Sequence, residues 1–129
     1  MGSLVNAPSL QTGVKLSLKD RAAASYQSTG VDVTDYEGMV AFEQGLISAT
    51  GAQTEAAIIQ TAEDSGFTVG VATVATFTTY TQSDLERYQR IVVDLATCKR
   101  YVRVNATLAG STPAISSAYF MTATKKYQP

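Results

Sequence analysis

Residues 99–126, KRYVRVNATLAGSTPAISSAYFMTATKK, decide the class of fold. Between Tyr101 and Leu108 small or apolar side chains at even positions alternate with larger or polar ones, and Gly110 and Pro113 follow. Period-two alternation that ends at Gly and Pro is typical of a half-buried β-hairpin. The segment therefore predicts two antiparallel strands joined by a turn over residues 110–113.

The same alternation recurs toward the N-terminus. Asp64, Ser65 and Gly66 are expected to form a three-residue hairpin loop with Gly66 in the left-handed conformation. Ser83 and Glu86 fit a capping box, which predicts at most one turn of helix. About seven or eight short strands separated by turn signals predict an all-β fold, an antiparallel β-sandwich or flattened barrel. Strands are expected within residues 14–18, 31–33, 40–42, 56–63, 67–75 and 90–95, besides the two C-terminal ones, and residues 76–82 are strongly β-prone.

The apolar face of each expected strand supplies the core. Replacing a buried Phe or Ile by Ala typically costs about 2–5 kcal/mol. The residues predicted to point inward are Val40, Phe42, Ile58, Val71, Ile91, Val93, Val102 and Val104.

Residues 1–30 carry a weaker core signal than the rest of the chain. A single short alternating run, residues 14–18, lies among small and polar residues. Such a segment cannot easily offset an ordering cost of about 1–2 kcal/mol per residue. The chain is therefore divided into an extended N-terminal arm, residues 1–30 with one short strand, and a β-sandwich domain, residues 31–129. The arm is either a loose tail or a segment that orders on a neighbouring subunit.

Composition excludes several classes of function. The 129 residues predict one domain, and ten basic and eleven acidic residues leave a net charge of −1. No basic run is present, so nucleic acid is not expected as a partner. No signal peptide and no membrane segment are expected, because no charged region precedes an apolar one and no apolar run approaches ~18 residues. One cysteine and no signal peptide favour a chain made in a reducing cytoplasm.

Chemistry for catalysis is sparse. The chain has no His, which removes the usual general base and the commonest metal ligand. Cys98 is either a small apolar residue beside a turn or, less favoured, a thiol whose pKa the neighbouring cations lower. Asp32, Asp35 and Glu37 could in principle hold Ca²⁺, but turn capping by Asp is the common use of this pattern. We expect a non-enzyme without cofactor or metal.

Tyrosine is frequent: the chain has seven and no Trp. Tyr offers a large apolar area with one polar end, which suits the rim of a core and equally suits an interface. A row of tyrosines that binds sugar is a third use, although the chain lacks the Trp that such platforms usually include.

Three segments resemble small β-sheet capsid decoration, or cement, proteins of tailed bacteriophages. These are VDVTDYEGMVAFEQGLIS (residues 31–48), AEDSGFTV (residues 62–69) and KRYVRVNA (residues 99–106), in that order. Proteins of that group sit outside the shell and clamp neighbouring major capsid subunits. The stretch over residues 76–90 departs from the simplest form of the group.

The resemblance implies a structural virion protein that binds the outer surface of the major capsid protein lattice and stabilises the head. It would be a homo-oligomer, a dimer or trimer at a local symmetry axis, on the capsid exterior. The alternatives are a non-catalytic carbohydrate-type β-sandwich module and a tail or head–tail component. The candidate subunit or capsid interface residues are Leu16, Tyr26, Tyr36, Tyr80, Tyr88, Arg100 and Tyr127.

Overall fold

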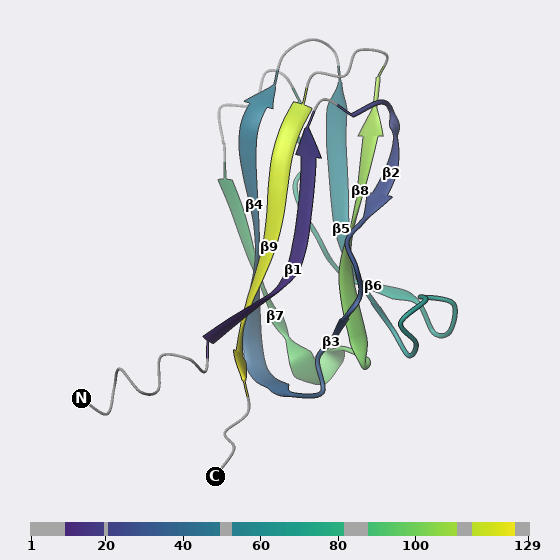
Figure 1. Cartoon of the computed structure of the whole chain (residues 1–129), viewed down its shortest axis with the longest axis vertical. Helices are drawn as coiled ribbons and strands as arrows, with labels where there is room; N and C mark the ends of the chain where they lie inside the picture. Colours follow the sequence, from purple (N-terminus) through teal and green to yellow (C-terminus); the bar gives the residue numbers. More distant parts are fainter. Residues whose placement is uncertain (1–9, 20, 50–52, 82–87, 111–114, 126–129) are drawn as a thin grey trace, which may run out of the picture.

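The computed structural model describes residues 10–19, 21–49, 53–81, 88–110 and 115–125. Within them nine strands form two antiparallel sheets that face one another (Figure 1). The predicted all-β antiparallel sandwich is confirmed, and the described helical content is one 3-10 turn, η2 (Leu95–Thr97). The strands are β1 (Leu10–Lys19), β2 (Ala24–Gln27), β3 (Val31–Asp32), β4 (Tyr36–Ala49), β5 (Thr54–Ala62), β6 (Ala72–Thr76), β7 (Tyr88–Asp94), β8 (Tyr101–Ala109) and β9 (Ile115–Lys125).

Each sheet combines strands from distant parts of the chain. Sheet A has the order β1-β9-β4-β7, and sheet B has the order β2-β8-β5-β6, with β3 also paired to β8. Strands β8 and β9, which the sequence predicts to be a hairpin, therefore lie in different sheets. That prediction is wrong because alternation determines which face of a strand is buried, not which strand pairs with it.

Alternation within β8 is confirmed residue by residue. Val102, Val104 and Ala106 are fully buried and Leu108 is 2% exposed, whereas the residues between them face outward. Strand β8 pairs with β5 on one side and with β2 and β3 on the other. Because it is central to sheet B, its buried face forms the middle of the core.

Six of the eight predicted core residues face the interior. Val40, Phe42, Val93, Val102 and Val104 are buried, and Ile91 is half-buried against the same cluster.

The prediction that Ile58 points into the core is wrong by one residue. The run AAII in β5 is apolar at both parities, so the sequence leaves the buried face open. Pairing of Ile59 with Val104 of β8 turns Ile59 inward, and Ile59 is fully buried while Ile58 is half-buried on the outer side.

Val71 is 42% exposed, because the expected hairpin loop over residues 64–66 is longer in the structure. The chain leaves β5 at Ala62 and re-enters a strand only at Ala72. Positive φ angles occur at Phe67 (54°) and Gly70 (64°) rather than at Gly66.

The Asp64 carboxylate holds this loop, residues 63–71, together. It accepts hydrogen bonds from the Thr68 hydroxyl (2.6 Å), the Thr68 amide (2.9 Å) and the Val69 amide (2.9 Å). These bonds keep the pKa of Asp64 at about 2, below its ordinary value. An aspartate that bonds amides four and five residues on favours a wider turn than the one predicted.

The N-terminal strands belong to the sandwich. Strand β1 pairs with β9, and its Val14 and Leu18 are buried in the core at 0% and 1% exposure. Strand β2 pairs with β8. The expectation that residues 1–30 order only on a neighbouring subunit is therefore wrong for β1 and β2, which find their partner strands within the chain. Residues 1–9 and the capping box at Ser83 and Glu86 lie outside the described residues.

The β-prone stretch over residues 76–82 is a strand only at its start. Strand β6 ends at Thr76, after which Phe77 donates a backbone hydrogen bond to Ala57 and Tyr80 forms an isolated bridge with Glu55. Phe77 and Tyr80 are buried. This stretch therefore runs along β5 with single contacts instead of a continuous ladder.

Candidate functional site

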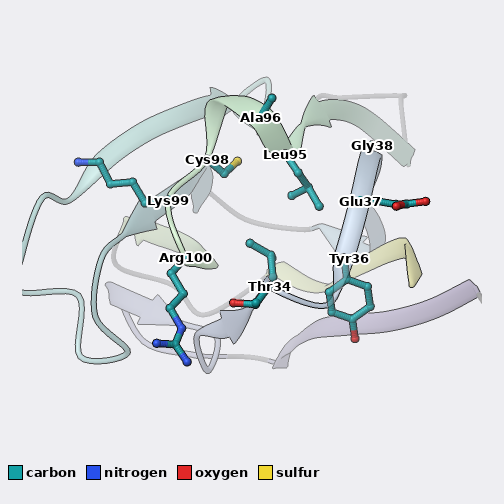
Figure 2. Close-up of a pocket in the computed structure, with 10 residues that line it drawn as sticks. Thr34, Tyr36, Glu37, Gly38, Leu95, Ala96, Cys98, Lys99 and Arg100 are labelled. Atoms are coloured by element: carbon teal, nitrogen blue, oxygen red, sulfur yellow. The ribbon is translucent and has the colours of Figure 1, made fainter. Parts of the chain in front are cut away.

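A pocket of about 430 Å³ opens at the end of the sandwich where β3 meets β4 and η2 precedes β8 (Figure 2). Segments that are about sixty residues apart in the chain form its two sides. We call it the end pocket. Its lining consists of Val33, Thr34, Tyr36, Glu37, Gly38, Leu95, Ala96, Cys98, Lys99 and Arg100.

An ion pair joins the two sides beside the pocket. The Asp32 carboxylate accepts from Arg100 Nε (3.1 Å) and Nη2 (2.9 Å), and also from the Thr34 amide (3.0 Å). The Val33 amide donates to the Arg100 carbonyl (2.8 Å). Arg100 and then Thr34 lower the pKa of Asp32 to about 2. Asp32 thus caps the turn, which is the common use of this pattern, and no group of three metal-ligating side chains occurs among the described residues.

The η2 turn forms the opposite wall. The Asp94 carboxylate accepts from the Ala96 amide (2.9 Å) at the start of η2, and the Cys98 amide donates to the Leu95 carbonyl (3.0 Å) at its end. Burial raises the pKa of the half-buried Cys98 thiol. A raised pKa disfavours the thiolate, so the structure supports the packing role of Cys98 over the reactive one.

Lys99 connects the end pocket to the loop over residues 63–71. Its amide donates to the Thr61 hydroxyl (2.7 Å), and its ammonium group donates to the Gly70 carbonyl. In Figure 2 Lys99 and Arg100 lie on one side of Leu95, with Glu37 on the other. The pocket therefore has an apolar wall, a cationic side and a single carboxylate opposite.

This arrangement suits binding. The chain has no His to pair with Cys98, and the lining contains no second carboxylate near Glu37. A half-buried Tyr36 ring and an exposed Arg100 are residue types that dominate the binding energy of protein interfaces. The end pocket therefore combines an apolar wall with residue types that are common in protein interfaces.

A second polar feature lies inside the sandwich. The fully buried Glu55 carboxylate on β5 accepts from Ser117 Oγ (2.7 Å), Gln44 Nε2 (2.8 Å) and the Tyr119 hydroxyl, all on sheet A. Burial first, and then the charge of Glu55, raise the pKa of Tyr119 well above its ordinary value. The cluster links the two sheets by hydrogen bonds and is closed to solvent, so it serves the fold.

The predicted interface residues fall into different places. Tyr36 and Arg100 meet at the end pocket. Tyr88 is 52% exposed on β7, where its hydroxyl donates to Glu43. Leu16 and Tyr26 are half-buried and pack against the core, and the Tyr26 hydroxyl donates to the Ala22 carbonyl (2.7 Å).

Tyr80 is 1% exposed and clusters with Ile115, which corrects its assignment as an interface residue: its ring faces the interior. Tyr127 lies outside the described residues.

Sequence reasoning missed the apolar wall of the end pocket. The strand expected within residues 90–95 ends one residue early, at Asp94, and Leu95 in η2 packs against the core and also lines the end pocket. The sequence does indicate a turn here, because Asp94 precedes a short non-strand segment and Asp is a preferred capping residue. No helix among the described residues is long and apolar enough to cross a membrane.

Comparisons with known proteins show the fold and no family. No protein-family model matches the chain. No curated protein matches it in sequence. Among solved structures, a chain of Bacillus endospore appendages, described as disulfide-linked pili, is 14% identical with a TM-score of 0.54 and matches 92% of this chain and 88% of its own length.

Two further structures are similar. A chain of infectious bursal disease virus, Gt strain, is 10% identical with a TM-score of 0.51; it matches 90% of this chain, which spans 32% of the viral chain. Chitosan-binding module 1 of a Paenibacillus sp. IK-5 chitosanase/glucanase is 20% identical, with a TM-score of 0.47 and coverage of 83% and 74%. None of the three is a phage decoration protein, and identities this low show an antiparallel β-sandwich alone.

Proposed function

We propose that this chain is a structural virion protein of the decoration type, which binds the outer surface of a capsid lattice. The observation that carries the proposal is the end pocket. It brings together Tyr36 and Arg100, two predicted interface residues that are distant in sequence, around an apolar wall. In this proposal the pocket accepts an apolar side chain of the major capsid protein, and the cations beside it meet an acidic neighbour.

Weak single contacts suffice for such a protein. A lattice offers many identical sites, and linked or repeated contacts multiply the overall affinity. A rigid pocket contributes by lowering the ordering cost of binding. The Asp32–Arg100 pair and the capped η2 turn hold the pocket walls in place from both sides. The protein would be made in the host cytoplasm and would reside on the capsid exterior.

Co-sedimentation with purified phage heads that lack this protein tests the proposal. Ala96 is exposed in the pocket lining, so Ala96→Tyr fills the pocket without disturbing the core. Ala109 is exposed at the end of β8, and Ala109→Tyr is the matched control. Wild type and A109Y should bind heads, whereas A96Y should lose roughly tenfold or more in affinity, the scale of an interface hot spot. Equal binding by A96Y, or no binding by wild type, would contradict the proposal.

A carbohydrate-binding role is the second candidate. The Tyr36 ring lines the same pocket as Glu37 and Arg100, so an apolar surface and hydrogen-bonding groups occur in one site, the combination that ligand sites use. A glycan array probed with wild type, A96Y and A109Y separates the two functions. Glycan binding that A96Y abolishes, together with no affinity for heads, would replace the capsid role by the carbohydrate role.

A further inference from the structure

The outer face of sheet A exposes apolar side chains that no described residue covers. Met39, Val92 and Phe120 come from the three adjacent strands β4, β7 and β9, and they are 58%, 44% and 44% exposed. We call these three residues with Ala41 and Thr122 the apolar face. Adjacent exposed apolar residues on several strands of a soluble protein mark a binding surface.

A groove runs through the apolar face. Its volume is about 260 Å³, and its walls include Met39, Val92 and Thr122 around Ala41. Ala41 lies directly opposite both Val92 and Thr122 in the strand register, so it forms the floor. Phe120 lies one outward position further along β9, next to the groove and not in its lining.

The charges around the apolar face are separated by sign. Lys15 and Lys19 point outward on β1, at one side of the sheet and toward the end where β9 begins. Glu37 and Asp94 are exposed on β4 and β7, toward the other side and the other end. The two lysines and the two carboxylates therefore occupy opposite corners of the same face.

Two further charges lie between these corners. Glu43 and Arg90 are directly opposite one another on β4 and β7, so their charges offset each other. The Tyr88 hydroxyl also donates to Glu43. The net pattern is a basic corner, an apolar and neutral middle, and an acidic corner.

We propose that the outer face of sheet A pairs with the same face of a second copy of this chain. A two-fold axis lying obliquely in the plane of the face exchanges the corners, so the lysines of each copy meet the carboxylates of the other. The same rotation stacks the apolar middle on itself and brings Phe120 of each copy over the groove around Ala41 of the other. A two-fold interface requires such a self-complementary patch, and two stacked sheets are a common packing in proteins.

This interface is separate from the end pocket in its central residues. Phe120, Lys15 and Lys19 do not line the pocket, and Ala96 does not lie on the apolar face. Of the residues named in this interface, Glu37 also lines the end pocket, whereas Phe120, Lys15 and Lys19 do not, so variants at these three positions test the dimer without changing the pocket. Failure of the capsid proposal and failure of the dimer proposal are therefore distinguishable.

Sedimentation equilibrium of the full chain over a range of concentrations and at low and high salt tests the dimer. Wild type should be a dimer whose dissociation constant rises with salt, because exposed ion pairs are screened. Phe120→Glu and Lys15→Glu/Lys19→Glu should each be monomeric at concentrations where wild type is dimeric. The control Gln60→Glu places a negative charge on the outer side of sheet B and should leave the dimer unchanged. Circular dichroism confirms that each variant is folded.

Complementation between variants tests the orientation of the two copies. Glu37→Lys/Asp94→Asn keeps an acceptor that can cap η2 while reversing the acidic corner. Alone it should be monomeric, and mixed with K15E/K19E it should form a mixed dimer. A monomeric wild type at all concentrations, or an F120E variant that remains dimeric, would overturn the proposal. Dimers of both charge variants on their own would overturn the corner-to-corner orientation.

Discussion

The outer faces of the two sheets differ in whether their side chains form hydrogen bonds with one another. On sheet B polar side chains bond one another across strands: Ser25 with Thr107 (2.9 Å), and Gln27 with Asn105 (3.0 Å). Arg103 donates to Gln60 (2.9 Å) and stacks on Phe67.

On sheet A the outward residues Met39, Val92 and Phe120 face solvent without such bonds. The polar side chains on the outer face of sheet B bond one another, whereas the outer face of sheet A has adjacent exposed apolar residues, which are typical of a binding surface. A domain without a catalytic constellation among its described residues can therefore still have one polar face whose side chains bond one another, on sheet B, and one apolar face suited to a partner, on sheet A.

The largest expected effect separates the inner from the outer side of sheet A. Phe42 is fully buried and Phe120 is exposed on the neighbouring strand β9. Phe42→Ala should lower the free energy of unfolding by about 3–5 kcal/mol, since it leaves a cavity. Phe120→Ala should change the monomer's free energy of unfolding by less than about 0.5 kcal/mol. Urea denaturation at protein concentrations below dimer formation measures both, and a large loss in F120A would mean that the apolar face serves the fold.

The next effect concerns the polar link between the sheets. Glu55→Ala removes the acceptor of the buried Tyr119 and Ser117 hydroxyls and one of the two acceptors of the Gln44 amide, which also donates to the Tyr119 hydroxyl. We expect a loss of about 3 kcal/mol in the free energy of unfolding, because unsatisfied buried polar groups are costly. Glu43→Ala on the outer side of β4, in the opposite sheet, is the control and should cost little. Thermal and urea denaturation of both variants check the difference, and equal effects would show that burial of Glu55 is unimportant.

A smaller loss of stability is expected for a substitution on the outer face of sheet B. The Arg103 guanidinium lies 4.2 Å from the centre of the Phe67 ring and donates to Gln60. Arg103→Ala should lower the free energy of unfolding by about 1 kcal/mol through the lost cation–π contact and hydrogen bond. Arg90→Ala on sheet A should have almost no effect on the monomer. If R90A were the more damaging variant, the contrast between the two faces would be reversed.

The smallest expected effect is the contribution of Asp64 to stability, which is lost at acid pH. Hydrogen bonds from Thr68 and Val69 hold the pKa of Asp64 at about 2, below its ordinary value of 3.8. A depressed carboxyl pKa adds stability that is fully present above about pH 4 and is lost as the pH falls through about 2. Asp64→Asn should therefore lower the melting midpoint at pH 5 and converge toward wild type near pH 2. Melting curves at pH 5, 3 and 2 measure it, and a constant difference would exclude this carboxylate as the cause.

Only part of the candidate site could be predicted from the sequence. Tyr36 is predicted as an interface residue because Tyr suits interfaces, Arg100 is in the same predicted set, and both line one pocket in the structure. Their proximity was not predictable, because pairing of β3 with β8 sets it across about seventy residues of chain. Tyr80 resembled the other tyrosines in sequence, and only the bridge to Glu55 turns it into the interior.

The sequence by itself determined the fold class and the buried face of most strands. Strict alternation, as in Val102 and Val104, leaves one side of a strand apolar. Because that side is stabilised by removal from water, it determines which face of the strand points inward. The tertiary structure alone decided which strands pair, the inward turn of Ile59 instead of Ile58, and the placement of β8 and β9 in opposite sheets. It alone also incorporated β1 into sheet A. The physical reason is that backbone hydrogen bonds are the same for every partner strand, so pairing depends on long-range packing of the whole core.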